Sequence, residues 1–323
     1  MNVLVTGGCG YIGSVLVPLL RGDDRVEQVV VLDDLSSGSP RNLVGSLGPG
    51  VTFRRGDIRE YGDVESAVRE VDAIVHLAAI TGAASTHDRR EETFATNLGG
   101  TRNVLRAAGK FGVESIVLAS SCNVYGRAMS TEIDETVEPE PINPYAESKY
   151  ESERLLEGHV ADHDAAGTTL RLSTVYGYAP GIRFNLVVNA FVFRALTGRP
   201  LTVYGDGSNW RPFIHAYDAA RAYRAALLAP EGWPELVYNV GESEENYRIE
   251  EIAQVVREEV GPVEITYLED EHPGPSYHAN FDRLTGTGFE PERTLREGVR
   301  GLAASLIGGD ERNEPSPTGR ADR

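Results

Sequence analysis

The chain has 323 residues, of which 41% are hydrophobic and 25% charged, and its formal net charge is −18. This length supports a substantial core in one large domain or two smaller ones. The acid excess, without any basic cluster, argues against nucleic acid or an anionic lipid surface as a partner. No apolar run of about 18 residues is present, and "MNVLVTGG" enters a strand pattern directly, so we expect a cytoplasmic protein without a membrane partner.

The first half alternates short apolar, β-rich segments with longer helical patterns. The apolar segments show little polar alternation, as expected for strands that are buried on both faces. Repeated strand and helix predict an α/β fold with a doubly wound parallel sheet. The predicted strands are 2–8, 26–34, 51–57, 71–79, 114–121 and 168–177, and the predicted helices are 12–21, 63–70, 91–111 and 144–160.

A glycine-rich turn follows the first predicted strand. Gly7, Gly10 and Gly13 lie where the chain turns into a helix. Such glycines let the backbone approach a pyrophosphate, and the helix N-terminus offers free N–H groups. The second strand ends in Asp33 and Asp34, where a carboxylate accepts hydrogen bonds from the adenosine ribose and repels a 2′-phosphate. We therefore predict NAD, rather than NADP, as the cofactor.

Tyr145 and Lys149 are four residues apart in a predicted helix, so they share one face. A free phenol has a pKa of about 10, but a nearby ammonium and the positive nicotinamide ring of NAD would both lower it. Lys149 and Lys110 are the only lysines among 31 basic residues, and a compact ammonium suits this task better than a rigid guanidinium. Ser121 ends a strand and would complete a proton-relay trio, although a serine that only caps the strand fits equally well.

After about residue 175 the pattern is less regular and richer in Gly, Pro and aromatic residues. It predicts a dinucleotide-binding domain at 1–175, to which the chain returns near 213–240, and a mainly substrate-binding α/β domain at 176–307. The polar tail at 308–323 is expected to be disordered. The predicted helices are 185–197, 216–228 and 248–259, and the predicted strands are 200–205 and 236–241.

Cys9 and Cys122 lie in different motifs, too few for a disulfide framework or a zinc site, so we expect buried thiols and no metal. The acidic, lysine-poor composition reflects either a GC-rich coding bias or adaptation to high salt. In the second case, concentrated salt would screen the self-repulsion of the carboxylates. The melting temperature should then rise between low and molar salt, and a value that does not rise would exclude salt adaptation.

Further landmarks follow in order along most of the chain: "GDI", "HLAA", "TNLGGT", "SSCNVYG", "PYAESK", "LRLSTVYG", "YGDGSNWRPFIHAYDAA" and "YNVG". Together with the glycine turn they resemble the extended short-chain dehydrogenase/reductase family. The similarity is to its NAD-dependent nucleotide-sugar epimerase/dehydratase branch, typified by UDP-glucose 4-epimerase. The resemblance runs to about residue 300 and implies a Rossmann-type sheet.

The resemblance also implies roles for individual residues. Asp33 would bind the adenosine ribose, and Ser121, Tyr145 and Lys149 match the catalytic positions of the family. In such enzymes Tyr145 would take the proton of a sugar hydroxyl while hydride passes to NAD. Further cofactor contacts would come from Tyr11, Ile12, Asp57, Ile58, Leu77, Ala78, Ala79 and Asn97, and substrate contacts from Thr81, Ser121, Thr174, Arg183, Asn189 and Arg211.

Four positions depart from the family patterns. Dehydratases have an Asp-Glu pair just after the Ser or Thr, where this chain has Cys122 and Asn123, which disfavours 4,6-dehydration. UDP-glucuronate decarboxylases commonly have Glu at the position of Asn123. Thr174 replaces a substrate-facing Asn of many members, and His272 lies about where many have an arginine for the substrate's diphosphate. The substrate therefore stays open.

The leading expectation is 4-epimerisation of a UDP-sugar through a transient 4-keto intermediate. One alternative is an NAD-dependent ketoreductase or dehydrogenase acting on a keto-sugar or another small carbonyl compound. Another is a sensor that binds NAD without turnover. The helices at 91–111 and 144–160 resemble the arms of the family's dimerising four-helix bundle, so we expect a homodimer.

Overall fold

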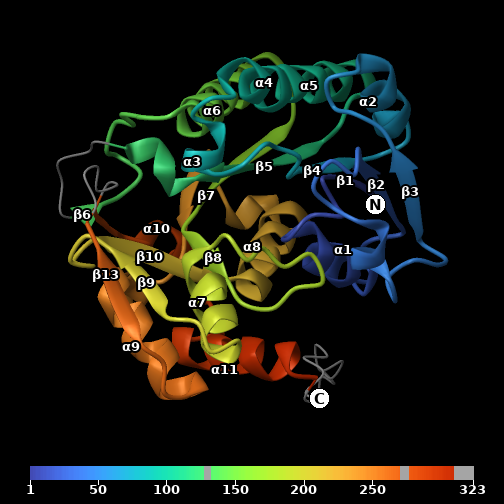
Figure 1. Cartoon of the computed structure of the whole chain (residues 1–323). Helices are drawn as coiled ribbons and strands as arrows, with labels where there is room; N and C mark the ends of the chain where they lie inside the picture. The colour runs from blue at the N-terminus through green and yellow to red at the C-terminus, as the bar shows by residue number, and fades with distance from the viewer. Residues whose placement is uncertain (127–131, 270–275, 309–323) are drawn as a thin grey trace, which may run out of the picture.

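The computed structural model describes residues 1–126, 132–269 and 276–308. A parallel sheet lies at the centre with helices on both faces, and a smaller α/β lobe adjoins it at the lower left of Figure 1. The predicted α/β fold with a doubly wound parallel sheet is confirmed. His272 and residues 309–323 of the predicted tail lie outside the described residues.

The central sheet has seven parallel strands in the order β11-β7-β5-β4-β1-β2-β3. The strand order reverses between β1 and β4. In doubly wound sheets, ligands bind at such a reversal, outside the carboxyl ends of the strands. The bounds are β1 Asn2–Thr6, β2 Gln28–Asp33, β3 Val51–Arg55, β4 Ala73–His76, β5 Ser115–Ser121, β7 Ala166–Leu172 and β11 Val237–Val240.

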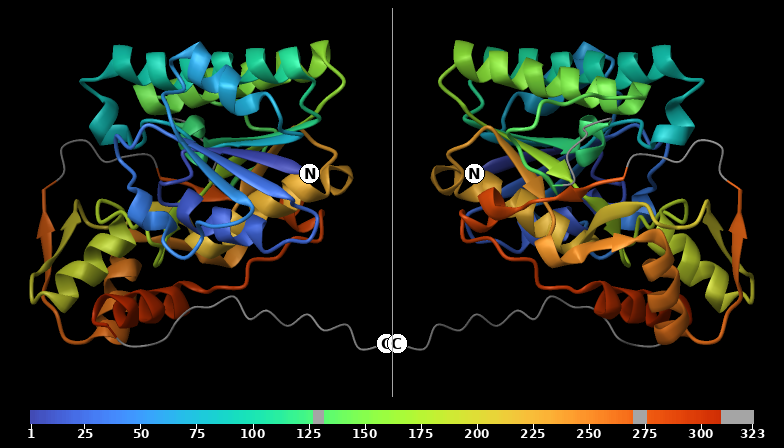
Figure 2. Two further views of the ribbon diagram at one scale, coloured as in Figure 1. Left: turned by 90° about the vertical axis from the view of Figure 1, so that its right-hand side faces the viewer. Right: turned by 90° about the vertical axis from the view of Figure 1, so that its left-hand side faces the viewer.

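Helices cover both faces of this sheet. One face carries α2 (Tyr61–Val68), α5 (Gly100–Phe111) and α6 (Pro144–Asp162), and the other carries α1 (Gly13–Arg21) and α8 (Ala216–Leu228). Figure 2 shows α5 and α6 as an outer layer above the sheet. Alternate strand side chains enter opposite clusters: Leu4 packs with the α5 side, and Val3 and Val5 with the α1 side. Burial on both faces explains the uninterrupted apolar runs.

The predicted helix at 91–111 is interrupted. The structure has α4 at Arg90–Phe94, a π-helical turn at Ala95–Gly99 (η2) and then α5. A π turn inserts one extra residue and shifts the side chains that follow, and such turns are frequent at functional sites. Here it holds the buried Asn97 against Ile80 and Ser148.

The apolar run predicted as one strand at 168–177 forms two strands in different sheets. β7 ends at Leu172, and β8 (Thr174–Tyr176) pairs instead with β10 (Trp210–His215), which in turn pairs with β12 (Asn246–Arg248). The chain thus leaves the main sheet at Ser173 and enters the smaller lobe. Both halves of the run are apolar, so periodicity alone could not locate this break.

The smaller lobe has its own core, formed by α7 (Val187–Leu196), α9 (Ile249–Val260), α11 (Leu295–Leu306), β9 (Leu201–Tyr204) and β13 (Ile265–Leu268). The helix α11 was not among the predicted helices. Its start has a capping box in which Thr294 and Glu297 exchange hydrogen bonds between side chain and backbone. The Thr-x-x-Glu spacing before an apolar pattern was the signal that could have revealed this helix.

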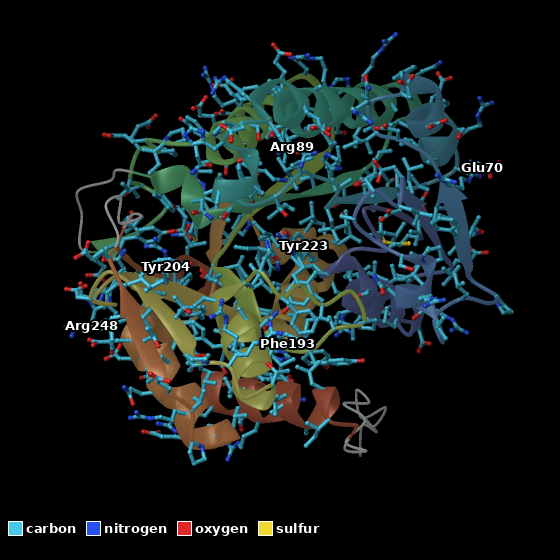
Figure 3. All side chains as sticks on the ribbon, viewed as in Figure 1. Glu70, Arg89, Phe193, Tyr204, Tyr223 and Arg248 are labelled. Atoms are coloured by element: carbon cyan, nitrogen blue, oxygen red, sulfur yellow. The ribbon has the colours of Figure 1, made fainter. Side chains whose placement is uncertain are left out.

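Between these lobe elements the chain returns to the main sheet, where α8 packs against α1 and β11 pairs with β7. Figure 3 shows Tyr223 of α8 inside the molecule, whereas Glu70, Tyr204 and Arg248 lie at its edge. None of the helices among the described residues is long and apolar enough for a bilayer. The remaining elements are α3 Ala83–Thr86, α10 Asp282–Thr285, β6 Glu132–Ile133, β14 His278–Ala279, η1 Pro40–Leu43, η3 Cys122–Tyr125, η4 Pro230–Gly232 and η5 Ser243–Glu245.

Candidate active site

The glycine turn between β1 and α1 presses against the segment that follows β4. Gly7 has a φ of +70°, and a Cβ on it would lie 2.8 Å from the backbone N of Ala78. A Cβ on Gly13 would lie 2.5 Å from the Cα of Gly8. Glycine is therefore required at these two positions, because a side chain at position 7 would collide with the segment after β4 and one at position 13 with the turn itself. Leu77 and Ala78 thus lie directly beside the turn, and Ala79 is the next residue in the chain.

The turn also presents backbone donors. Among the described residues, no hydrogen-bond acceptor is found for the N–H groups of Tyr11 and Ile12, and no side chain caps α1. Free N–H groups and the positive end of a helix dipole together favour an anion. The residues present therefore fit the pyrophosphate of NAD, and cofactor contacts of Gly7, Gly10, Tyr11, Ile12 and Gly13 stay a prediction.

Asp33 lies at the end of β2, beside this turn. One carboxylate oxygen accepts a hydrogen bond from Cys9 N and the other from Leu35 N, both at 2.9 Å. Burial raises the pKa of this carboxyl, and the two backbone donors oppose the rise. Each oxygen keeps a lone pair, so the carboxylate can hold the turn and still accept hydrogen bonds from ribose hydroxyls. The less buried Asp34 accepts a hydrogen bond from Ser36 N at 2.9 Å.

Asp57 and Ile58 follow β3, and the backbone joins this segment to Asp33 through a hydrogen bond from Gly56 N at 3.1 Å. They therefore lie along the same edge of the sheet as Asp33. Asp57 pairs with Arg59, whose hydrogen bond holds the pKa of that carboxyl below its usual range. Ile58 is buried against Gly100 of α5. This placement suits the cofactor contacts predicted for Asp57 and Ile58.

Gly7→Ala is expected to weaken NAD binding at least roughly tenfold, because the left-handed backbone and the contact with Ala78 leave no room for a methyl group. Isothermal titration calorimetry with NAD would measure the change in Kd. Gly62→Ala on α2 is the matched control, since a Cβ there meets nothing within 4 Å. Equal affinity of the wild type and Gly7→Ala would contradict this placement of the pyrophosphate.

Asn97 joins the segment after β4 to α6. Its Oδ1 accepts a hydrogen bond from Ile80 N at 2.8 Å, and its Nδ2 donates to Ile80 O at 3.0 Å and to Ser148 Oγ at 2.9 Å. Both N–H bonds of the amide are thus used within the protein. Asn97 was predicted to contact the cofactor. In this structure its amide instead holds the segment after β4 in place against α6.

Ser121, Tyr145 and Lys149 meet near the carboxyl end of β5. Asn143 Oδ1 accepts a hydrogen bond from Ala146 N at 2.9 Å, which sets the first turn of α6. Tyr145 and Lys149 consequently face the protein interior and are only 9% and 4% exposed. Lys149 Nζ donates to the carbonyl oxygen of Ala119, two residues before Ser121, at 2.9 Å. This face of α6 is therefore packed inside the protein and is not a solvated surface.

Lys149 has its own electrostatic surroundings. Burial lowers the pKa of Lys149 to about 8, and the negative charge of Glu153 opposes this change. His76 lies near the ammonium, with Nδ1 2.6 Å from Thr6 Oγ1 and Nε2 3.1 Å from Thr101 Oγ1. Burial and the charge of Lys149 lower the pKa of His76 to about 3, so this imidazole is neutral at pH 7. Lys149 is still mainly charged at that pH.

The phenol of Tyr145 is buried, and burial raises its pKa. The Ser121 hydroxyl and the positive charge of Arg183 act in the opposite direction. The sequence predicted a lowered pKa from an ammonium and a nicotinamide ring together. In the structure, the cost of burying a phenolate outweighs the charges that this chain supplies. Arg183, predicted to contact substrate, is also a cation that acts on the phenol.

Three predicted substrate residues meet in one place. Arg183 Nη1 donates a hydrogen bond to Thr81 Oγ1. Asn189 is buried and accepts a hydrogen bond from Gly177 N at 2.9 Å, while its Nδ2 donates to Tyr11 OH and to Arg183 O, each at 3.0 Å. Both N–H bonds of Asn189 thus hold the segment between β8 and α7, rather than pointing to a ligand.

Two further predicted substrate residues, Thr174 and Arg211, lie on the three-stranded sheet. Thr174 pairs in register with Phe213. Arg211 Nη1 donates to Trp210 O at 3.0 Å, and its guanidinium carbon lies 5.7 Å from the ring centroid of Tyr277. Burial lowers the pKa of Arg211, as it does that of Arg183, and no carboxylate among the described residues pairs with either. Both cations are therefore available to an anionic ligand.

A buried ion pair behind the trio was not predicted. Glu153, one turn after Lys149 on α6, pairs with Arg171 of β7 at 2.6 Å, and both side chains are 5% exposed. Arg171 Nη1 also donates to Tyr125 OH at 2.9 Å. The spacing of Tyr145, Lys149 and Glu153, four residues each, was a signal that all three share one helix face.

Both cysteines are free and buried, as predicted. Burial raises the pKa of Cys9 and that of Cys122 to about 12, so neither thiol is reactive. Within residues 1–126, 132–269 and 276–308, no three His, Cys, Asp or Glu side chains gather as metal ligands would.

Comparisons with known proteins show which family the chain belongs to. The family model "NAD dependent epimerase/dehydratase family" matches residues 3–241. The chain is 33% identical to the low-salt glycan biosynthesis protein Agl12 of Haloferax volcanii, over 96% of this chain and 100% of that protein. It is 32% identical to the dTDP-glucose 4,6-dehydratase of an Actinoplanes species, over 93% and 95%.

Among solved structures, the UDP-glucose 4-epimerase of Thermus thermophilus in complex with NAD superposes with a TM-score of 0.82 at 31% identity, covering 95% of this chain and 99% of that one. The predicted family is thereby confirmed. With its seven-stranded parallel sheet, glycine turn and Tyr-x-x-x-Lys helix, the chain is an enzyme of the NAD dependent epimerase/dehydratase family.

Proposed function

We propose that the protein is an NAD-dependent nucleotide-sugar 4-epimerase, with a UDP-sugar as the first substrate to test. One observation carries the proposal. A complete Ser121, Tyr145 and Lys149 trio is present, whereas Cys122 and Asn123 occupy the positions where dehydratases have an acid and a base.

The residues of the trio have separate tasks in this proposal. Tyr145 takes the proton of the sugar 4-hydroxyl and returns it after the keto-sugar has turned over in the site. Ser121 donates a hydrogen bond to the reacting oxygen, and the Lys149 ammonium stabilises the phenolate. NAD, when bound, supplies a reversible hydride acceptor and a positive ring that further favours the phenolate. Burial then serves the chemistry, because it strengthens each of these charge interactions.

Removal of water requires a second acid and base, which Cys122 and Asn123 do not supply. The Cys122 thiol is buried, its pKa is raised to about 12, and it donates to Arg171 O at 3.2 Å. The amide of Asn123 does not titrate. These two side chains therefore cannot remove water from a 4-keto intermediate. The intermediate can only be reduced again, on one face of the sugar or the other.

Arg183 and Arg211 support an anionic substrate. Both guanidinium groups are partly buried, in a chain of net charge −18, without a carboxylate partner among the described residues. Buried cations without a counterion are costly, and a sugar-nucleotide diphosphate would supply the missing negative charge.

The test is incubation of the protein and NAD with separate UDP-, dTDP- and GDP-sugars, followed by chromatographic separation of the products. The expected result is a C4 epimer without net NADH. A keto-sugar or alcohol formed with stoichiometric change in NADH would replace epimerisation by the ketoreductase reaction. If no sugar gives a product, both the epimerase and the ketoreductase proposals are wrong.

We also propose a homodimer through α5 and α6, which form an outer layer in Figure 2. Among the described residues, no large hydrophobic side chain of α5 or α6 is strongly exposed, so the contact would be largely polar at its rim. Light scattering should give twice the mass of the chain, and a monomer at all concentrations would contradict the proposal.

A further inference from the structure

We propose that Asn123 is a positioning residue that sets the direction of the Ser121 hydroxyl proton, turning it toward Tyr145 and the reacting sugar oxygen. The inference rests on the proposed function, in which Ser121 acts as a hydrogen-bond donor. It gives a chemical role to one of the two positions that separate this chain from the dehydratases.

Asn123 donates two hydrogen bonds to the Oγ of Ser121. Ser121 ends β5, and its Oγ accepts a hydrogen bond from Asn123 N at 3.2 Å and a second from Asn123 Nδ2 at 3.1 Å. A serine hydroxyl has two acceptor lone pairs and one proton. Asn123 fills both lone pairs, so the proton of Ser121 must be donated elsewhere.

The phenol of Tyr145 is the other neighbour of the Ser121 hydroxyl. The Ser121 hydroxyl is buried near the phenol of Tyr145, and its presence lowers the pKa of that phenol. The donors therefore run in one direction, from Asn123 to Ser121 and from Ser121 to Tyr145. A hydroxyl held in this way is preorganised as a donor before the sugar arrives, which is the state that stabilises an oxyanion.

A carboxylate at position 123 would reverse this direction. An ionised side chain there can only accept, so Ser121 would turn its proton toward residue 123 and away from Tyr145. Asn123→Asp is therefore expected to lower kcat about 10- to 100-fold while KM changes less than about threefold. Asn123→Ala keeps the backbone donor and should lower kcat only about two- to fivefold.

A readout that needs no substrate separates this inference from the proposed function. Tyrosine labelled with 13C at Cζ reports the titration of Tyr145 by NMR in the NAD-bound protein, and Tyr145→Phe identifies the signal. When Ser121 is present, Asn123→Asp should raise the pKa of Tyr145 strongly. In a Ser121→Ala background the same substitution should raise it much less, because only the direct repulsion by the new charge is left.

Equal effects of Asn123→Asp with and without the Ser121 hydroxyl would overturn the inference, as would equal kcat for Asn123→Asp and Asn123→Ala. If the wild type epimerises no sugar, the proposed function fails, yet the titration still decides whether Asn123 orients Ser121. Circular dichroism of each variant confirms that it folds.

Discussion

Replacing Lys149 with methionine is expected to abolish turnover and at the same time make the fold more stable. Turnover should fall roughly 10²- to 10⁴-fold, because the buried phenolate loses its ammonium. Stability should rise by about 2 kcal/mol at pH 7. Burial lowers the pKa of Lys149 from 10.5 to about 8, which is worth about 3 kcal/mol against folding, and the lost bond to Ala119 O returns about 1 kcal/mol.

The pH dependence gives an independent check of the sign. Between pH 8 and 10.5 the unfolded chain holds the Lys149 proton more tightly than the folded one, so this group makes the free energy of unfolding increase with pH. Below pH 8 the charged form is present in both states and the full penalty applies. The stability difference between Lys149→Met and the wild type, from urea unfolding, should thus shrink from pH 7 to pH 9.

The chain contains a matched control. Lys110 is its only other lysine, and the Lys110 side chain is 55% exposed, where it pairs with Glu65 on the surface. Lys110→Met should leave turnover unchanged and stability within about 1 kcal/mol. Lys149→Arg keeps the charge but puts a larger planar group into a buried site, so its turnover should also fall. Near-full turnover of Lys149→Arg would refute the role of Lys149.

Breaking the buried pair of Glu153 and Arg171 is expected to cost about 3–5 kcal/mol of stability. Arg171→Leu leaves the Glu153 carboxylate, which is 5% exposed, with only the Ser120 hydroxyl and the nearby Lys149 ammonium to stabilise it. Urea unfolding would measure the loss. Glu153→Leu should cost a similar amount, and the double variant should cost less than the sum, because neither member of the pair is then left without the other.

A surface pair serves as the comparison. Arg296 lies 2.7 Å from Glu258 and 2.8 Å from Glu259, and its own side chain is 50% exposed, so solvent screens both attractions. Arg296→Leu should therefore cost no more than about 1 kcal/mol. If Arg171→Leu cost as little stability as Arg296→Leu, the buried ion pair would not stabilise the fold. The proposed influence of Glu153 on the pKa of Lys149 would then be in doubt as well.

Several features of the site follow from local sequence alone. The glycines at positions 7, 10 and 13 and the acid at the end of the next strand have fixed spacing, so they predicted a turn that fits a pyrophosphate and a ribose. Tyr145 and Lys149 are placed on one face by helix geometry, whatever surrounds the helix. The uninterrupted apolar runs predicted a parallel sheet, because strands of this kind must be covered on both faces.

Other features depend on partners that are distant in the sequence. Asn189 pairs with Tyr11, 178 residues away, which the apolar helix pattern around it does not indicate. The break at Ser173, between two apolar strands, is decided by which sheet each strand joins. Packing of the whole molecule buries Tyr145, and burial raises the pKa of its phenol, an effect that the Tyr-x-x-x-Lys spacing does not indicate.

Periodicity and spacing within single elements are enough to predict the fold class, NAD as the cofactor and Ser121, Tyr145 and Lys149 as candidate catalytic residues. How each group is used depends on the tertiary structure: which amides bind within the protein, which arginines have no carboxylate among the described residues, and which way the donors around Ser121 are arranged. These depend on burial and on contacts between separate elements, and neighbouring residues in the chain do not specify them.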